Sequence, residues 1–221
     1  MARVTTPKDG AKRAKAEMYR RLILEAAEKV FAQHGFDDAK IQDIAQAAGI
    51  ALGTLYTVFP GKTEIYDAIQ ELRGREILES IFRSIQGYSD FLDAAMRGIE
   101  AYVRSLAERP DYLRMHLREG LSWAEREVLK SDEQVATWER GMSLAVSLLQ
   151  AGIDRGVLFA DNPPELQLKM MIASHQVQLS DWLARGASTA EVESLIVRMQ
   201  SHFRRAFVCE SSEPKRARPA R

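Results

Sequence analysis

The side chains of this chain with the clearest capacity for chemistry lie between Lys40 and Lys62, and they suit binding rather than catalysis. The segment 41–63 reads IQDIAQAAGIALGTLYTVFPGKT and carries the hydroxyls of Thr54 and Thr57, the phenol of Tyr56 and the ammonium of Lys62. Such groups hydrogen-bond to phosphate oxygens and to base edges.

Residues 60–63, Pro-Gly-Lys-Thr, copy the last half of a phosphate-binding P-loop. The complete motif needs a glycine five residues before Gly61 and a preceding strand. Tyr56 occupies that position and the surrounding pattern is helical. The sequence therefore excludes a nucleotide site of this kind.

No residue cluster predicts an enzyme, a metal site or a cofactor. The four histidines form no close pair with one another or with Cys209, which is the sole cysteine and excludes a disulfide. Ser122 and Ser143 lack a recognisable nucleophile motif. We therefore expect no catalytic residues and no cofactor. The histidines are His34, His116, His175 and His202.

Two short helices around Gly49 position the hydroxyls of the opening segment. Gly49 stands where the first helix must end in a left-handed turn, and Ala45 is small enough for the second helix to cross closely. This spacing predicts a helix-turn-helix, whose second helix enters the DNA major groove. Apolar residues fall at helical spacing at Ile41, Ile44, Ala45 and Ala48, and again at Leu52, Leu55, Tyr56 and Phe59.

Residues that typically begin or end helices also occur on both sides of this motif. A stripe predicts a helix from Lys15 to His34 capped by Gly35, with Asp38 as a substitute cap for the next helix. Gly61 is the expected N-cap of a helix that Gly74 could bend. Further starts fall at Ser89 or Asp90, and at Pro110, Asp132, Asn162 and Ser188. With no convincing two-residue alternation, the expected class is all-α, with an N-terminal three-helix DNA-binding head and a larger C-terminal helical domain that binds ligand and dimerises.

The predicted domains are an arm over residues 1–14, a DNA-binding domain over 15–74, an effector-binding and dimerisation domain over 75–208, and a disordered tail over 209–221. The chain has 221 residues and no net charge, yet residues 1–21 hold seven basic and two acidic side chains. The arm is either a disordered terminus or a segment that enters the minor groove. No apolar run approaches about 18 residues and no signal-peptide core is evident, so we expect a soluble, cytoplasmic protein with no membrane partner.

The two C-terminal helices have apolar residues on more faces than one neighbour can cover. We expect an αα-hairpin that pairs with a second copy as a four-helix homodimer interface; the alternative is a helix buried in the centre of one domain. The residues predicted for the interface are Met170, Val177, Leu195, Met199 and Phe203.

Large, soft side chains are concentrated in the C-terminal body. Most suit a core, but they would also line a small-molecule site. The candidates for such a site are Met96, Tyr102, Met115, His116, Trp123, Trp138, Met142, His175 and Gln176.

The head resembles the DNA-binding domain of the TetR family of bacterial transcriptional regulators. The likeness is carried by Gly35-Phe36, the stretch 44–50 (IAQAAGI), the stretch 53–59 (GTLYTVF) and Lys62. The chain departs from the family pattern at Ala51, where a capping Ser or Thr is usual, at Ala39-Lys40 in place of a Thr/Ser pair, and at Val58 in place of Tyr or His. The resemblance implies a homodimer that binds a double-stranded DNA operator, most often as a repressor, and an unknown small-molecule effector.

The motif assigns roles to the candidate contact residues. Ala51 and Leu52 would touch thymine methyl groups, Gly53 would allow a close approach, and Tyr56 and Lys62 would bind phosphates. Two alternatives stay open: a constitutive or architectural DNA-binding protein without an effector, and an all-α small-molecule-binding protein. The full set of predicted DNA contacts is Lys40, Gln42, Ala51, Leu52, Gly53, Thr54, Tyr56, Thr57 and Lys62.

Overall fold

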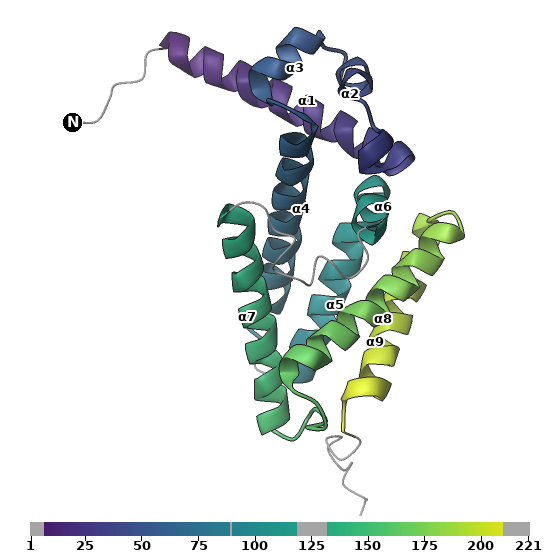
Figure 1. Cartoon of the computed structure of the whole chain (residues 1–221). Coiled ribbons are helices and arrows are strands. Elements are labelled where there is room, and N and C mark those ends of the chain that lie inside the picture. Colours follow the sequence, from purple (N-terminus) through teal and green to yellow (C-terminus); the bar gives the residue numbers. More distant parts are fainter. Residues whose placement is uncertain (1–6, 89, 119–131, 210–221) are drawn as a thin grey trace, which may run out of the picture. The chain divides into compact units, whose positions relative to one another are not determined.

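The computed structural model describes residues 7–88, 90–118 and 132–209 (Figure 1). Within these ranges every regular element is helical, apart from an isolated antiparallel bridge between Leu158 and Val208. The predicted all-α class is confirmed. The elements are α1 (Pro7–Asp38), α2 (Ile41–Ala47), α3 (Leu52–Val58), α4 (Lys62–Ile85), α5 (Phe91–Ala107), α6 (Pro110–Arg118), α7 (Asp132–Asp154), α8 (Pro164–Ala184), the 3-10 helix η3 (Thr189–Glu191) and α9 (Val192–Phe207).

The chain divides into two compact units that interleave in sequence. The first contains Met1–Arg73 together with Asp111–Gly120, and the second contains Gly74–Pro110 together with Leu121–Arg221. Helix α4 therefore begins in the first unit and continues into the second at Gly74. Helix α6, expected in the C-terminal body, belongs from Asp111 onward to the first unit.

Helix α1 begins at Pro7, earlier than the predicted start at Lys15. Residues 7–14 of the predicted arm are therefore helical and continuous with α1. Proline is well tolerated in the first turn of a helix, and the alanines, lysines and arginine that follow are good helix formers. At the other end, the helix is kinked at Gly35, whose φ of 79° is the left-handed conformation predicted for it.

The first unit is organised around a continuous apolar core. Gly49 has a φ of 67°, and an added Cβ there would meet no atom within 4 Å, so its requirement is for backbone conformation rather than space. Ala45 is buried, as predicted for the residue under the crossing helix. The core side chains that are almost wholly inaccessible include Ile23, Ala27, Phe31, Ile44, Leu55, Ile65 and Ile69.

Polar contacts hold the base of this unit together. Glu28 on α1 and Arg73 on α4 form a buried ion pair, in which Arg73 Nε donates to Glu28 Oε1 at 2.6 Å. Arg118 on α6 donates from Nη1 to the carbonyl oxygen of Phe31 at 3.0 Å. This last bond fastens α6 to α1, although the two helices are far apart in sequence.

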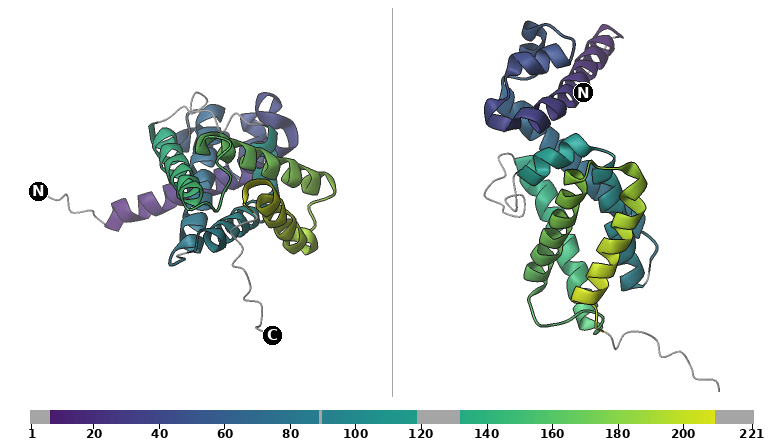
Figure 2. Two further views of the ribbon diagram at one scale, coloured as in Figure 1. Left: turned by 90° about the horizontal axis from the view of Figure 1, so that it is seen from below. Right: turned by 90° about the vertical axis from the view of Figure 1, so that its right-hand side faces the viewer.

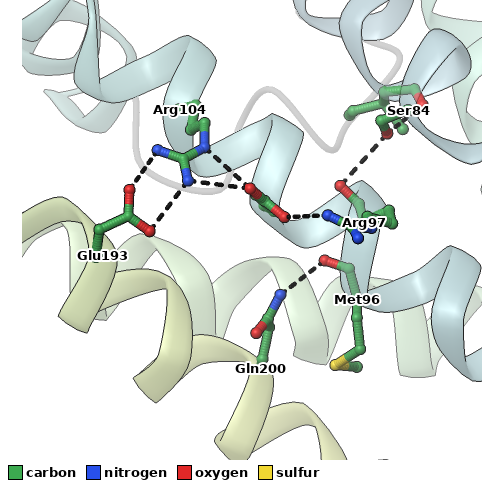
Figure 3. Close-up of polar contacts among 8 residues, drawn as sticks. Ser84, Met96, Arg97, Arg104, Glu193 and Gln200 are labelled. Carbon is green, nitrogen blue, oxygen red and sulfur yellow. Dashed lines mark hydrogen bonds and ion pairs between the residues drawn. The ribbon is translucent and has the colours of Figure 1, made fainter.

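In the second unit, α5 and α9 are joined by a set of polar contacts (Figure 3). The guanidinium of Arg104 donates to both carboxylate oxygens of Glu193, at 2.7 and 3.0 Å, and also to Glu100 Oε1. Further along the same pair of helices, Gln200 Nε2 donates to the carbonyl oxygen of Met96 at 2.9 Å. Asp90 caps α5 by accepting from the Asp93 amide at 2.9 Å, which confirms its predicted role.

Helices α8 and α9 lie side by side as the predicted hairpin (Figure 2). The turn uses two left-handed residues, Gly186 with a φ of 98° and Ala187 with a φ of 54°, and Trp182 Nε1 donates to the carbonyl oxygen of Ser188 at 3.1 Å. Ser188 makes no side-chain cap. The residues after it form a 3-10 turn before α9 begins at Val192.

Candidate DNA-binding surface

Helix α3 has one buried side and one side open to solvent. Its apolar anchor is Leu55, which is completely inaccessible to solvent. Ala51 is the N-cap, with an extended backbone (φ −66°, ψ 143°) and no side-chain cap. The cap position predicted from the sequence is therefore correct, and the hydroxyl usual there is missing.

The open side of α3 carries most of the predicted DNA contacts. Tyr56, for example, leaves 49% of its surface accessible even though it is a large aromatic residue. Leu52 and Thr54 are partly exposed, at the margin of this surface. The exposed members of the predicted set are Lys40, Gln42, Ala51, Gly53, Tyr56 and Thr57.

The two threonines of α3 differ in what they can offer to DNA. Thr57 Oγ1 donates to the carbonyl oxygen of Thr54 at 2.6 Å, so its proton is used within the helix. A hydroxyl oxygen retains acceptor capacity when its proton is engaged. In this conformation Thr57 can accept a hydrogen bond from a base amine, such as the exocyclic amine of adenine or cytosine.

The Lys62 ammonium, predicted to bind a DNA phosphate, is engaged with backbone groups of the head in this structure. It donates to three backbone carbonyl oxygens, those of Phe36 at 2.6 Å, Asp37 at 3.0 Å and Ala39 at 3.1 Å. It also stands over the Phe36 ring, 4.6 Å from the centroid. An ammonium has three N–H donors, and here all three are engaged. Lys62 instead ties the start of α4 to the loop between α1 and α2.

A groove that sequence reasoning did not identify runs beside the end of α3. The first half of α1 contributes Arg13, Glu17 and Arg20, and α3 contributes Thr57 and Val58. Arg20 also stacks on the Phe59 ring, with its guanidinium carbon 4.9 Å from the centroid. The seven basic residues near the N-terminus were a visible signal, but only the helical conformation of residues 7–20 shows which of them flank α3.

The residues predicted to contact an effector divide between the two units. Met115 and His116 are buried on α6, which belongs to the first unit from Asp111 onward, whereas Met96, Tyr102, Met142, His175 and Gln176 belong to the second. Trp123 and the side chain of Trp138 lie outside the described residues.

Two polar groups of this set stand out in the second unit. Tyr102 on α5 and His175 on α8 have ring centroids 5.9 Å apart. Tyr102 Oη and His175 Nε2 are both buried, and neither has a hydrogen-bond partner in the described part of the chain. Burial lowers the pKa of His175 to about 4, with a smaller contribution from His202, and burial also raises the pKa of Tyr102. Both side chains are therefore neutral near pH 7.

The predicted dimer interface is split by the structure. Leu195, Met199 and Phe203 are buried within a single chain. Met170 and Val177 are exposed instead, with 70% of the Val177 surface accessible. The exposed large apolar residues of α8 and α9 are Leu166, Met170, Val177 and Val197.

Comparisons with known proteins identify the head. Residues 23–69 match the family model described as bacterial regulatory proteins, tetR family. The head of this chain is a TetR-family DNA-binding domain. The matched range contains the helix-turn-helix described above, so DNA-binding regulation follows for this chain.

Relatives of this TetR-family regulator extend the likeness beyond the head. The uncharacterized HTH-type transcriptional regulator YhgD of Bacillus subtilis is 25% identical over 164 residues, which are 74% of this chain and 83% of YhgD. The HTH-type transcriptional repressor Rv1474c of Mycobacterium tuberculosis is 29% identical over 115 residues, covering 48% of this chain and 57% of Rv1474c. A crystal structure of a putative TetR-family regulator from Shewanella sp. PV-4 has a TM-score of 0.69 at 18% identity, over 87% of this chain and 99% of that one.

These comparisons place the regulator among DNA-binding proteins and not among enzymes, as the sequence predicted. In the described ranges, no three His, Cys, Asp or Glu side chains are grouped as they would be around a metal ion. None of the described helices has the length and apolar character needed to cross a membrane.

Proposed function

We propose that this TetR-family regulator is a homodimeric repressor that leaves its operator when a small molecule binds its second unit. The observation that carries the proposal is the open side of α3, where exposed polar groups are mounted on a helix anchored by the fully buried Leu55. A rigid helix with an exposed polar face suits direct reading of base edges in the major groove. Repression is supported by the relative Rv1474c, which is an HTH-type transcriptional repressor.

Within this proposal, the exposed residues of α3 divide into two roles. Gly53 and Thr57 face the base edges, with Ala51 and Leu52 against thymine methyl groups. Tyr56, Lys40 and Gln42 bind phosphates or groove edges on either side, which fixes register rather than sequence. Thr54 could take either role, at a base edge or at a phosphate.

Arg13 and Arg20 take over the phosphate-binding role that the sequence assigned to Lys62. Both guanidinium groups line the groove next to Thr57 at the end of α3. Arginine forms bidentate bonds with phosphate oxygens, and positive charge beside a reading helix raises affinity for all DNA sequences alike. Glu17 lines the same groove. Its carboxylate either orients the arginine side chains or repels the DNA phosphates, and we expect it to limit the affinity for DNA.

The dimer is proposed to form through the exposed sides of α8 and α9. Leu166, Met170 and Val177 follow helical spacing along α8, and Val197 is exposed on the adjacent α9. Two such hairpins related by a two-fold axis bury these residues as a four-helix bundle. A dimer presents two heads, which suits a palindromic operator with half-sites about one helical turn apart.

Effector release requires a link between the two units, and the chain provides two. Helix α4 runs continuously across the junction at Gly74, and α6 lies in the first unit while the segments on both sides of it belong to the second. A ligand in the second unit changes DNA affinity only if it prefers one arrangement of these connections over another.

Selection from a random pool of duplexes tests the proposal directly. The purified protein should enrich a palindrome, and Thr57→Val should change which bases are enriched while Arg20→Ala weakens binding to every sequence. Enrichment of no sequence by the wild-type protein would contradict a specific regulator and favour a constitutive architectural protein.

A further inference from the structure

Two neighbouring polar atoms inside the second unit lack the partners that buried groups normally have. Tyr102 Oη on α5 and His175 Nε2 on α8 are sealed from solvent and unbonded among the described residues, although their rings are only 5.9 Å apart between centroids. They do not bond to each other. More than nine in ten buried polar groups find a partner, so two orphans side by side indicate a missing group.

The residue one turn further along each helix on the same face is a buried leucine. These are Leu106 on α5 and Leu179 on α8, both inaccessible to solvent. The Tyr102 residue as a whole keeps some accessible surface while its hydroxyl keeps none.

The charge of the pair limits what that group can be. Both side chains are neutral, since burial disfavours their charged forms. The nearest strong cation along α5, Arg104, is already bonded to Glu100 and Glu193, and on α8 Lys169 is exposed. An anionic ligand group would lose its hydration without gaining a counter-charge from these residues.

We propose that Tyr102 and His175 together bind one neutral oxygen, a hydroxyl or a carbonyl, at the polar end of an otherwise apolar effector. A ligand hydroxyl can accept from Tyr102 Oη–H and donate to an unprotonated Nε2. A carbonyl oxygen can accept from Tyr102 and from Nε2–H of the other imidazole tautomer. The proposal rests on the function proposed above and specifies the class of effector.

The first test needs no ligand. Tyr102→Phe removes an orphan hydroxyl and keeps the ring, so the melting temperature of the free protein should rise or stay unchanged. Tyr88→Phe is the matched control, because Tyr88 is exposed and its loss of a hydroxyl leaves the melting temperature as it was. A clear fall for Tyr102→Phe would show that the hydroxyl has an internal partner and would overturn the proposal.

The second test uses 2-decanone, 1-decanol and decanoate, which share an apolar chain and differ in the polar end. Isothermal titration into the DNA-free protein should show the ketone or the alcohol binding more tightly than decanoate. Tyr102→Phe should weaken that binding about tenfold, as expected for one lost hydrogen bond, while Tyr88→Phe leaves it unchanged. Decanoate binding at least as tightly, absence of binding by both neutral probes, or equal affinity in Tyr102→Phe would each overturn the proposal.

A separate measurement distinguishes ligand binding at this site from the proposed release of DNA by the ligand. Release of labelled operator is followed on addition of whichever neutral probe binds. Binding without release contradicts effector control at this site but leaves the Tyr102–His175 site standing. Release of the operator by the probe, together with weaker probe binding by Tyr102→Phe, supports both the Tyr102–His175 site and effector control.

Discussion

Lys62 Nζ donates a 2.6 Å hydrogen bond to the carbonyl oxygen of Phe36, and the same ammonium is held over the Phe36 ring. The start of α4 is thereby fastened to the end of α1 at a point where three carbonyl oxygens converge. The charge of Lys62 therefore helps to hold this loop against the start of α4.

Lys62→Met should destabilise the protein by about 1–3 kcal/mol, because it leaves partly buried carbonyls without their charged donor. The salt dependence of DNA binding by the folded variant should keep its slope. Lys40→Ala is the control, since Lys40 is exposed: its stability should not change and the slope should become shallower by about 1. Urea unfolding and binding titrations at several salt concentrations measure both quantities. A shallower slope for Lys62→Met would return Lys62 to the DNA surface.

Ala51→Ser should raise the unfolding free energy by about 0.5–1 kcal/mol, because a hydroxyl at the N-cap of α3 satisfies an amide that now has no side-chain partner. Ala47→Ser, in the last turn of α2, provides a control with the same chemical change but no cap to form. Thermal or urea unfolding of both variants decides the matter. Equal effects in the two would mean that water or another group already caps α3.

Gly53→Ala should lower the affinity for the operator without lowering the stability of the fold. An added Cβ at Gly53 meets no atom within 4 Å, and alanine is a better helix former by up to about 1 kcal/mol, so the fold should be stabilised or unaffected. Affinity for the operator should fall, because the methyl group occupies the space where the helix approaches DNA. Gly98→Ala on α5 is the control, with ordinary contact to Ile85 at 3.6 Å. Undiminished affinity in Gly53→Ala would show that α3 does not approach DNA closely at this point.

Val177→Arg should give a folded monomer with weak operator binding, because it places two charges against each other across the proposed two-fold axis. Phe203→Arg should instead unfold the second unit, since Phe203 is buried within one chain. Phe159→Arg, at an exposed apolar residue outside α8 and α9, should stay dimeric. Sedimentation and circular dichroism on the three variants measure assembly and folding. A dimeric Val177→Arg protein would place the interface elsewhere.

Unfolding free energy should decrease as pH falls from about 6.5 toward 4. Burial lowers the pKa of both His116 and His175 to about 4, so over this range the unfolded chain binds more protons than the folded chain. Each histidine accounts for at most about 3 kcal/mol of the loss. His175→Gln should flatten the pH dependence measured by urea unfolding, whereas substitution of the exposed His34 should not. An unchanged profile in His175→Gln would mean that this side chain is not kept neutral by the fold.

Local patterns in the sequence predicted the features that depend on neighbours along the chain. The left-handed conformations of Gly35 and Gly49 and the missing cap at Ala51 follow from the residue types at helix ends, and all three are as expected. The spacing of Met199 and Phe203 likewise indicated burial, and both are buried. It could not show whether the covering surface belongs to the same chain or to a second copy.

Features that depend on distant parts of the chain were missed. The carbonyls that engage Lys62 lie 23 to 26 residues earlier, and no periodicity connects them to it. Similarly, Tyr102 and His175 come from helices separated by α6 and α7, so their proximity could not be predicted. The early start of α1 had a signal in Pro7 and the residues after it, but the high charge of that segment favoured the interpretation as an arm.

The bond from Arg118 to the Phe31 carbonyl also has a consequence for the order of folding during synthesis. Domains generally fold as they leave the ribosome, N-terminal parts first. Here the first unit is discontinuous in sequence, and α6 emerges only after the end of α4 and the whole of α5. The helix-turn-helix is therefore without its last supporting helix while Gly74–Pro110, about the first quarter of the second unit, is being synthesised. A nascent chain arrested before Asp111 should carry a head that is more easily cleaved by protease than one arrested well beyond Arg118.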